Sequence, residues 1–329
     1  MTFKKFRYLM GRLLGIKKYL NKIIPGESLD LGKLLHGTPD GPLAVQPFKD
    51  NRPVVTMSNF GHNGRFGNQL FQYTFLSLVA RKQCAQLQLP VWSGSSLFRL
   101  NPSLDIKYPN KITKESELNL SEIINLIRVA EEKFEGIDFD GQAQLPTSYY
   151  AADKDFIRSL FILDVRLLNF FQGARAHLGL AQKKIIAIHL RRGDYGYNQY
   201  FRAPCSWYEK WLSQAGYSPD EYIIYICSES PEKYLKRFSK FTVITSADLN
   251  CPAQLASYLD FMVMTLADAV ATSNSSFSFF ASMLNAKTSQ FYRPDFDKLG
   301  LVQFDPWNAD PLLNKALSPA EHQYLKSID

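Results

Sequence analysis

The 329-residue sequence contains only four cysteines, Cys84, Cys205, Cys227 and Cys251, and none of them forms a CxxC or Cys/His pair. This spacing excludes a disulfide framework and a zinc site, and it favours small buried thiols in a reducing compartment. We expect no secretory signal, because basic residues interrupt the N-terminal apolar residues and no small-residue cleavage site follows. We also expect no membrane span, because the longest uncharged stretch, residues 269–286, carries many polar side chains that lipid would leave unpaired.

Acidic residues are missing from residues 1–25, which hold seven lysines and arginines. The net charge of the whole chain is +7, so this one segment accounts for the excess. The remainder is close to neutral, which gives no indication of a general nucleic-acid-binding face. The hydrophobic content of 46% and the length predict a folded protein with room for two domains.

Residues 1–52 are predicted to form a basic amphipathic segment followed by a linker. Apolar side chains recur there at helical spacing between basic ones: Phe6, Met10, Leu13, Leu20 and Ile24. Such a helix could bind an anionic membrane surface, or it could be a basic extension that packs on the protein or stays mobile. The first alternative predicts a cytoplasmic protein that is peripheral on the inner face of a bacterial membrane.

Residues 53–82 predict a strand, a glycine-rich loop and an apolar helix in succession. The strand is Val54–Met57, the loop spans residues 61–69, and the helix begins near Leu70. This order aims backbone N–H groups and a helix N-terminus at an anion, although a purely structural turn has the same order. The loop contains neither the GxGxxG motif nor a P-loop, so a dinucleotide or ATP motif is not indicated.

Residues 183–195 predict a buried parallel strand that ends in charged residues. The strand is rich in isoleucine and leads into His189, Arg191, Arg192, Gly193 and Asp194. Ligands of open α/β sheets bind beyond the carboxyl ends of the strands, so these side chains are expected to line a crevice. Two adjacent guanidinium groups suit a diphosphate, whereas a strand end with solvated charges is the alternative.

Alternating strands and helices continue through the second half, which predicts a parallel, doubly wound sheet. A strand from Tyr222 ends at Ser228 and Glu229, and the polar run 272–276 precedes a helix whose N-terminus could hold a phosphate. The simplest α/β architecture is two Rossmann-like domains facing each other across a cleft. We assign residues 53–180 to the first, acceptor-side domain and residues 181–329 to the second, nucleotide-sugar-binding domain with a C-terminal return segment.

Two short acidic patterns, residues 138–140 and 295–297, match the DxD pair that many sugar transferases use to hold a divalent metal. Both stand beside turn residues, Asp140-Gly141 and Pro294-Asp295, so turn chemistry explains them equally simply. A metal-dependent transferase would depend on one of them. We favour turn chemistry and expect no metal site.

Three segments together resemble glycosyltransferase family 11, the α-1,2-fucosyltransferases. Residues 64–73 resemble its Gly-x-x-Gly-Asn-Gln-x-Phe-Gln-Tyr motif, residues 189–195 its His-x-Arg-Arg-Gly-Asp-Tyr motif, and residues 274–278 its Asn-Ser-Ser-Phe-Ser segment. The three occur in the family's order and span about residues 54–293. The resemblance implies a GT-B type fold, a GDP-fucose donor, inversion at the anomeric carbon and no metal or other cofactor.

The resemblance also implies site residues. The catalytic candidates are Arg191, Arg192, Asp194 and Asn68. The donor-binding candidates are His189, Arg191, Arg192, Asp194, Ser228, Glu229, Asn274, Ser275, Ser276, Arg65, Gly67 and Gln69. The sequence departs from the family in having Ser228-Glu229-Ser230 where Ser-Asp-Asp is usual, beside the expected nucleotide pocket, and Phe279-Phe280 where Trp-Trp is usual.

These features predict an inverting transferase that moves L-fucose from GDP-fucose to the 2-hydroxyl of a galactoside during surface glycan biosynthesis. Its partners would be the nucleotide-sugar donor, a glycan or lipid-linked oligosaccharide acceptor and an anionic membrane surface, with no nucleic acid. The alternatives are a GT-B transferase that uses another nucleotide sugar and a non-catalytic, membrane-peripheral glycan-binding protein. A donor panel separates the first alternative, and binding of oligosaccharide without turnover would indicate the second.

Overall fold

The computed structural model describes residues 51–329 except for residues 99, 101–102, 104–105, 110–111, 198–199 and 314–315. The predicted amphipathic helix and most of the predicted linker, which fall in residues 1–50, lie outside the described residues. Among the helices of the described part, none is long and apolar enough to cross a membrane.

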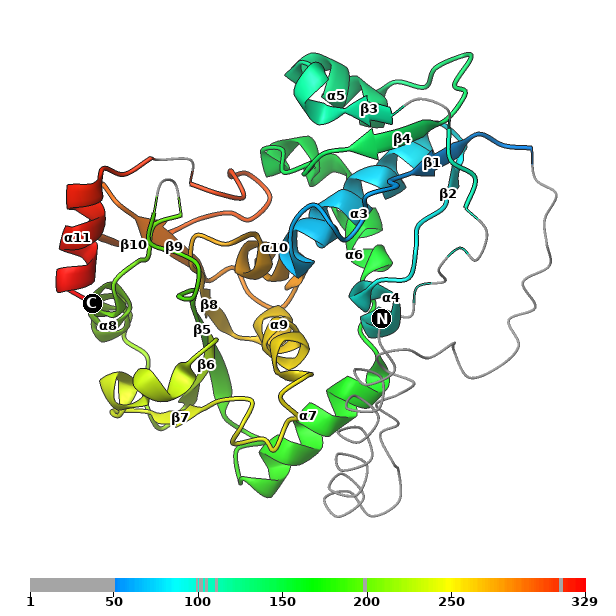
Figure 1. The fold of residues 1–329 in the computed structure, drawn as a ribbon. Coiled ribbons are helices and arrows are strands. Elements are labelled where there is room, and N and C mark those ends of the chain that lie inside the picture. The colour runs from blue at the N-terminus through cyan, green and yellow to red at the C-terminus, as the bar shows by residue number, and fades with distance from the viewer. Residues whose placement is uncertain are drawn as a thin grey trace, which may run out of the picture.

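The first domain is built on a four-stranded parallel sheet in the order β2-β1-β4-β3. Its strands are β1 (Val54–Thr56), β2 (Gln86–Leu87), β3 (Ile112–Lys114) and β4 (Ile137–Asp140). Its α-helices are α3 (Phe66–Lys82), α4 (Ser93–Leu97), α5 (Leu120–Arg128) and α6 (Lys154–Leu160), with 3₁₀ turns at Glu115–Glu117, Thr147–Tyr149 and Ala151–Asp153. Helix α7 (Val165–His177) comes next in the chain but lies beside the second domain (Figure 1). Helix α3 is buried along most of its length, as expected of a helix with apolar residues on every face.

The second domain is built on a six-stranded sheet in the order β10-β9-β8-β5-β6-β7, in which only β10 runs antiparallel to its neighbour. Its strands are β5 (Lys184–Leu190), β6 (Tyr222–Ser228), β7 (Thr242–Ile244), β8 (Ala269–Ala271), β9 (Phe291–Asp295) and β10 (Gly300–Gln303). Its helices are α8 (Cys205–Gln214), α9 (Ala256–Leu266), α10 (Ser276–Leu284) and α11 (Pro319–Ser327), with 3₁₀ turns at Pro231–Lys233 and Leu235–Phe238. The α/β architecture with two parallel, Rossmann-like sheets is therefore as predicted (Figure 1).

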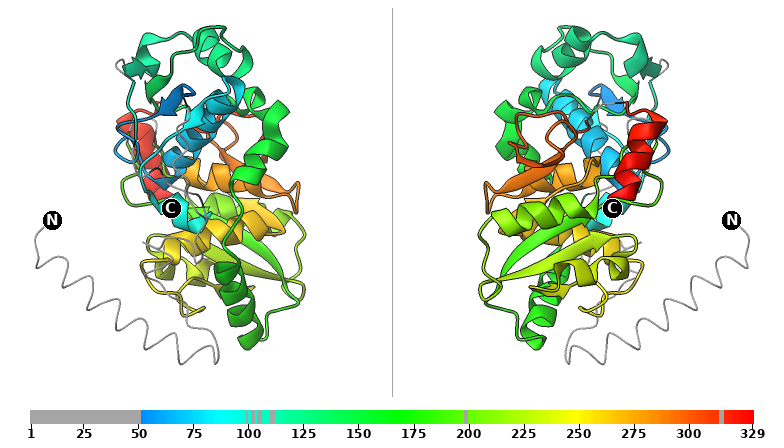
Figure 2. Two further views of the ribbon diagram at one scale, coloured as in Figure 1. Left: turned by 90° about the vertical axis from the view of Figure 1, so that its right-hand side faces the viewer. Right: turned by 90° about the vertical axis from the view of Figure 1, so that its left-hand side faces the viewer.

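The strand register brings the polar ends of β5, β6 and β8 to one edge of the second sheet. Leu190 at the end of β5 pairs with Ser228 at the end of β6, and Ile188 pairs with Ala271 at the end of β8. The residues that follow these strands are consequently neighbours. They face the first domain, which is stacked on the second in both side views of Figure 2.

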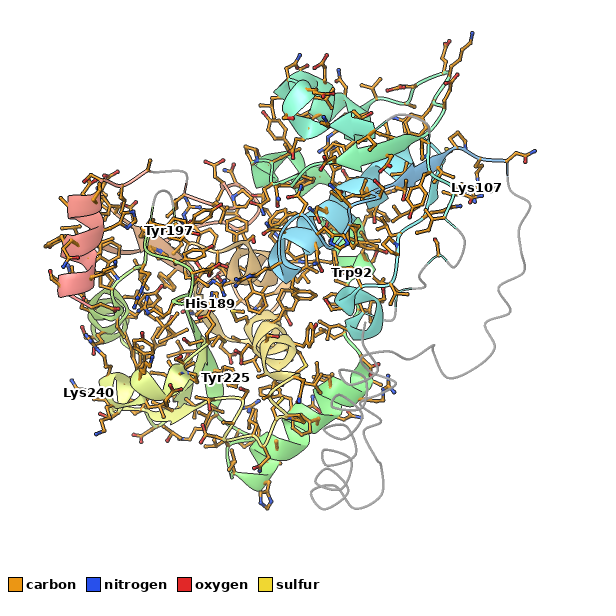
Figure 3. The ribbon with its side chains drawn as sticks, in the orientation of Figure 1. Trp92, Lys107, His189, Tyr197, Tyr225 and Lys240 are labelled. Carbon is orange, nitrogen blue, oxygen red and sulfur yellow. The ribbon has the colours of Figure 1, made fainter. Side chains whose placement is uncertain are left out.

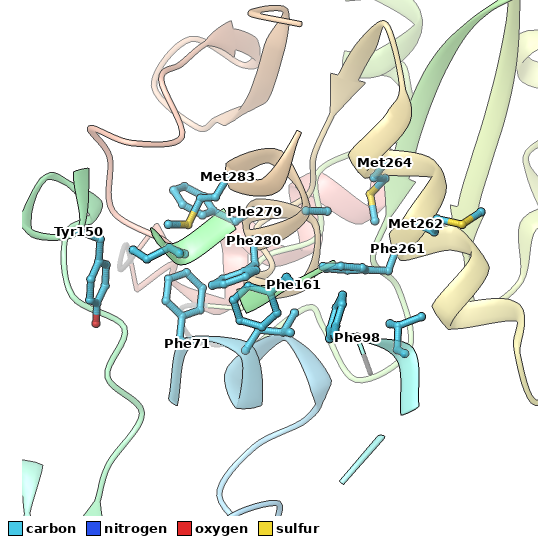
Figure 4. Close-up of a cluster of buried hydrophobic side chains, with 14 of the residues drawn as sticks. Phe71, Phe98, Tyr150, Phe161, Phe261, Met262, Met264, Phe279, Phe280 and Met283 are labelled. Atoms are coloured by element: carbon cyan, nitrogen blue, oxygen red, sulfur yellow. The ribbon is translucent and has the colours of Figure 1, made fainter. Parts of the chain in front are cut away.

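One hydrophobic core continues through both domains. Helix α3 of the first domain packs on α10 of the second, where the Phe71 and Phe280 rings meet edge to face with centroids 4.9 Å apart. Phe161 contacts Phe280 at 5.1 Å, and Phe98 contacts Phe161 at 5.0 Å (Figure 4). These side chains are nearly or fully excluded from solvent, so the interface between the two sheets is as apolar as the interior of a domain.

The C-terminal return segment contacts both domains. The backbone N–H of Thr147 in the first domain donates to the Ala309 carbonyl at 2.9 Å, and Ala309 N–H donates to Thr147 Oγ1 at 3.1 Å. Helix α11 instead lies beside α8 on the second domain (Figure 1), and Ser206 Oγ donates to the Ile328 carbonyl at 2.9 Å. The segment before α11 thus joins the domains, whereas the helix itself belongs to the second.

Candidate functional site

A cavity of about 1030 Å³ lies between the domains, where β5, β6 and β8 end and where α3 and α10 begin. Ten of the residues predicted from the sequence line it: Arg65, Gly67, Asn68, His189, Arg191, Asp194, Ser228, Glu229, Ser275 and Ser276. These residues come from four separate regions of the chain, three of which are the motifs. The fold therefore brings the three motifs together around one space.

Arg191 lies at the centre of this cavity between two carboxylates. Its Nη2 donates to Asp194 Oδ1 at 2.7 Å, and its Nη1 is paired with Glu229 Oε1. Its Nε is buried and has no hydrogen-bond partner in the described part of the chain. Because a guanidinium has five N–H donors, Arg191 can keep both ion pairs and still donate to an anionic ligand.

Contacts between the first and second domains close the wall of the cavity beside Arg191. Arg65 Nη2 pairs with Asp194 Oδ2 at 3.1 Å. Asn68 accepts a hydrogen bond from Ser276 Oγ at 2.6 Å and donates to Gln142 Oε1 at 2.6 Å. The start of α3 is thereby fixed against the start of α10 by side chains that also line the cavity.

His189 lies in the wall of the cavity as a neutral imidazole. Burial, with further contributions from Arg191 and Arg192, lowers the pKa of His189 to about 3. Its Nδ1 is hydrogen-bonded to Ser273 Oγ at 2.9 Å, which leaves Nε2 as the nitrogen that a ligand can reach. A neutral imidazole can donate or accept one hydrogen bond there without adding charge.

Helix α10 begins at the cavity. Ser275 is its N-cap, with Oγ accepting from Phe277 N–H at 3.4 Å, and Ser276 is its first residue. The first turn of the helix holds no acidic residue. The N-terminus of a nine-residue helix, two hydroxyl groups and Arg191 therefore face the same space, which is a suitable environment for a phosphate.

Three residues in the predicted set do not line this cavity: Arg192, Asn274 and Gln69. The Arg192 guanidinium is buried on the other face of the sheet, where it donates to Tyr234 Oη, the Ala203 carbonyl and Asp329 Oδ1 at 3.0, 2.8 and 3.1 Å. Asn274 Oδ1 accepts from Leu313 N–H at 2.8 Å, so its amide fixes the return segment. Arg192 and Asn274 thus stabilise segments next to the cavity without lining it.

Three carboxylates of the two DxD patterns accept hydrogen bonds from neighbouring loop residues. Asp138 accepts from Ser58 N–H at 2.8 Å, and Asp140 accepts from Asn59 Nδ2 at 2.6 Å. Asp295 accepts from Lys298 N–H at 2.9 Å in the turn between β9 and β10. Within the described residues, no group of three or more His, Cys, Asp or Glu side chains is arranged to hold a metal ion.

Asp260 on α9 is a cavity residue that the sequence analysis missed. It is 9% exposed, and Tyr225 Oη donates to its Oδ1 at 2.9 Å. Burial raises the pKa of Asp260 to about 8, the Tyr225 hydrogen bond opposes this, and Glu229 adds to it. An acidic residue inside the apolar run Leu259–Leu266 is the sequence signal that could have identified it.

Replacing Asp260 with asparagine is expected to change how stability depends on pH. The folded state keeps a proton that the unfolded chain releases near pH 4, so stability falls as the pH rises toward about 8. The variant should lack this dependence, which is about 1.4 kcal/mol per pH unit for one proton. Urea unfolding of both proteins at pH 5, 6, 7 and 8 measures it, and parallel pH profiles would contradict the assignment.

Comparisons with known proteins give a fold-level likeness. No family model and no curated protein sequence matches the chain. Among solved structures, the α-1,6-fucosyltransferase NodZ soaked with GDP-fucose is 14% identical, with a TM-score of 0.48 over 78% of this chain and 99% of NodZ. NodZ from Bradyrhizobium is 13% identical, with a TM-score of 0.45 over the same shares of the two chains. An Arabidopsis thaliana FUT1 variant in complex with GDP is 11% identical, with a TM-score of 0.46 over 88% of this chain and 80% of FUT1. The proposals below rest on this chain's own residues.

Proposed function

We propose that this chain is a glycosyltransferase that moves L-fucose, with inversion, from GDP-fucose to the 2-hydroxyl of a galactoside. The observation that carries this proposal is the position of Arg191. Its guanidinium group lines a cavity between two Rossmann-like domains, together with the N-terminus of α10. The three motifs that resemble family 11 supply the choice of sugar and linkage.

In this proposal the diphosphate of the donor binds between Arg191 and the start of α10. The acceptor oxygen bonds to the anomeric carbon while the bond from that carbon to the phosphate oxygen breaks, and the electron pair leaves with GDP. The acceptor hydroxyl releases its proton. Arg191 and the helix N-terminus stabilise the charge that develops on the leaving phosphate, and they are already in place before the reaction.

The guanine base would bind at the end of the cavity that contains Asp260. Guanine presents an exocyclic amino group and an N1–H as donors, and a carboxylate accepts both. Because the pKa of Asp260 is raised to about 8, GDP binding would release a proton from this group at neutral pH. This residue gives the site a means to distinguish guanine from uracil, whose corresponding edge lacks the amino group.

We further propose that the protein acts at the inner face of a bacterial membrane in surface glycan biosynthesis. The seven basic residues among residues 1–25 support this location through attraction to anionic lipid headgroups. The acceptor would then be a glycan carried on a lipid at that surface.

A donor panel tests the proposed reaction. We expect GDP to bind in isothermal titration without added metal and UDP to bind at least tenfold more weakly, because only guanine satisfies Asp260. We expect labelled fucose to be transferred from GDP-fucose to lactose, with and without EDTA, and no transfer from GDP-mannose or UDP-galactose.

Each outcome of the panel has a defined meaning. Transfer from UDP-galactose alone would replace the donor with another nucleotide sugar. Loss of transfer in EDTA would show a requirement for metal. Oligosaccharide binding without GDP affinity, in a protein that circular dichroism shows to be folded, would indicate a non-catalytic glycan-binding role and would overturn the proposal.

A further inference from the structure

Three tyrosines from the loop after β5 line the cavity beyond Arg191. The Tyr195 ring lies 5.2 Å from the Arg191 guanidinium carbon, the Tyr195 and Tyr200 ring centroids are 5.3 Å apart, and Tyr200 is 5.7 Å from Tyr197. We call these three residues the tyrosine cluster. The cluster begins at the proposed phosphate position and ends at Tyr197, which is 50% exposed. Tyr197 lies in the loop that follows β5, the strand that contains His189 (Figure 3).

The tyrosine cluster is held in place by its backbone and by neighbouring polar groups. Tyr195 N–H donates to the Arg192 carbonyl at 2.8 Å, and its ring packs against the Arg191 guanidinium. Tyr197 and Tyr200 form an antiparallel bridge, and Gly196 N–H donates to the Tyr200 carbonyl. The cluster is therefore a preformed aromatic surface on one side of the cavity.

The first domain contributes a polar side chain, Gln144, to the same cavity. Gln144 follows β4 and lines the cavity, and its Nε2 is buried without a hydrogen-bond partner in the described part of the chain. An amide side chain that lines a cavity offers a donor and an acceptor, which suit the hydroxyl groups of a sugar. This observation is independent of the tyrosines, because it concerns a different domain.

We propose that the tyrosine cluster and Gln144 form the acceptor subsite, and that they bind a β-galactoside. This inference rests on the proposed function, and it assigns the acceptor to Gln144, Tyr197 and Tyr200, which lie outside the motifs, together with Tyr195 at the end of one of them. The cavity of about 1030 Å³ exceeds the common upper range for a single small ligand, so it has room for a donor and one acceptor sugar together. Because inversion requires the acceptor oxygen to approach the anomeric carbon from the side opposite the leaving phosphate, the fucose would lie between the acceptor and Arg191.

The chemistry of the subsite favours galactose over glucose. In β-galactose the axial 4-hydroxyl lies on one face of the ring, and the C–H groups at carbons 3, 4 and 5 form a continuous apolar patch on the other face. Aromatic side chains bind such a patch through the hydrophobic effect, and the amide of Gln144 can donate to a ring hydroxyl. In glucose the equatorial 4-hydroxyl interrupts this division into a polar and an apolar face.

The test compares Tyr197→Ala with Tyr197→Phe in the full chain, with methyl β-D-galactoside and methyl β-D-glucoside as acceptor probes. Tyr197→Ala should raise KM for the galactoside about tenfold and reduce the preference for galactoside over glucoside. Tyr197→Phe keeps the ring and should stay within about threefold of wild type. Gln144→Met, which removes the donor at similar size, should also raise the galactoside KM severalfold.

Donor measurements separate this inference from the proposed function. GDP affinity should stay within about twofold of wild type in all three variants, because their side chains lie outside the proposed diphosphate position, and Tyr324→Ala, at a 47% exposed tyrosine on α11 outside the cavity, should match wild type throughout. If wild type neither binds GDP nor hydrolyses GDP-fucose, the proposed function fails. If wild type transfers fucose and Tyr197→Ala leaves the galactoside KM unchanged, the acceptor subsite is wrong.

Discussion

Arg191→Ala is expected to weaken GDP binding at least tenfold and to lower kcat/KM with GDP-fucose by at least ~10²-fold. Arg191 lines the cavity beside the start of α10, and its two terminal nitrogens can donate to a phosphate in addition to their ion pairs with Asp194 and Glu229. Its loss removes an interaction that strengthens as charge develops on the leaving group. Isothermal titration with GDP and initial rates of fucose transfer measure the two effects.

Arg81→Ala serves as the matched control for this result. Arg81 lies on α3 outside the cavity, where it pairs with Asp153 at 3.4 Å and is largely exposed. Its removal should change neither GDP affinity nor rate by more than about twofold. If Arg191→Ala kept near-normal kcat/KM in a protein with wild-type melting behaviour, the assignment of the diphosphate to this end of the cavity would be wrong.

Gly67→Ala is expected to destabilise the protein and to impair the donor site at the same time. A Cβ at position 67 would lie 2.5 Å from Phe277 N and 2.8 Å from Ser276 Oγ, closer than atoms can approach. The start of α10 must then move away from α3, at a cost of roughly 1–3 kcal/mol. Thermal unfolding should show a lower Tm, and GDP titration should show weaker binding because Ser276 and the helix N-terminus are displaced.

Gly173→Ala provides the contrast. Gly173 lies within α7, where an added Cβ would meet nothing within 4 Å. Alanine is the better helix former, so this variant should gain up to about 1 kcal/mol of stability and bind GDP normally. A Gly67→Ala protein with the Tm and GDP affinity of wild type would show that α3 and α10 are less closely packed than the structure has them.

The strands and the loops that follow them could be predicted from the sequence because local patterns determine them. The isoleucine-rich run before His189 is buried as β5, and its charged end reaches the cavity. The register of β5 with β6 and β8 then brings Ser228 and Glu229 to the same edge. Their proximity could be predicted because the carboxyl ends of neighbouring parallel strands lie at the same edge of a sheet.

The direction of Arg192 also follows from a local rule, although the sequence analysis did not apply it. Side chains alternate between the two faces of a strand, so His189 and Arg191 face one way while Leu190 and Arg192 face the other. The first pair lines the cavity, and the second pair is buried against the far face. If the alternation of side chains along a strand had been applied to the motif, it would have predicted that Arg191 and Arg192 face opposite sides of the sheet.

Asp260, Gln144, Tyr197 and Tyr200 could not be located by motif. The side of α9 that carries Asp260 meets the cavity only because α9 packs beside α10 and β6. Gln144 reaches the cavity through the stacking of one domain on the other, which is a contact between distant parts of the sequence. Such positions depend on tertiary packing between distant segments, which a local sequence pattern does not predict.

The hydrophobic core shared by both domains limits how the protein can open. Enzymes with two Rossmann-like domains can admit a ligand by rotating one domain about a hinge, but here such a rotation would expose the Phe71, Phe161 and Phe280 rings to water. Substrate entry must therefore depend on side chains at the mouth of the cavity, such as Tyr197 and the Arg65–Asp194 ion pair. For the same reason, neither half of the chain is suited to expression alone, because each would present to solvent the face that now joins it to the other.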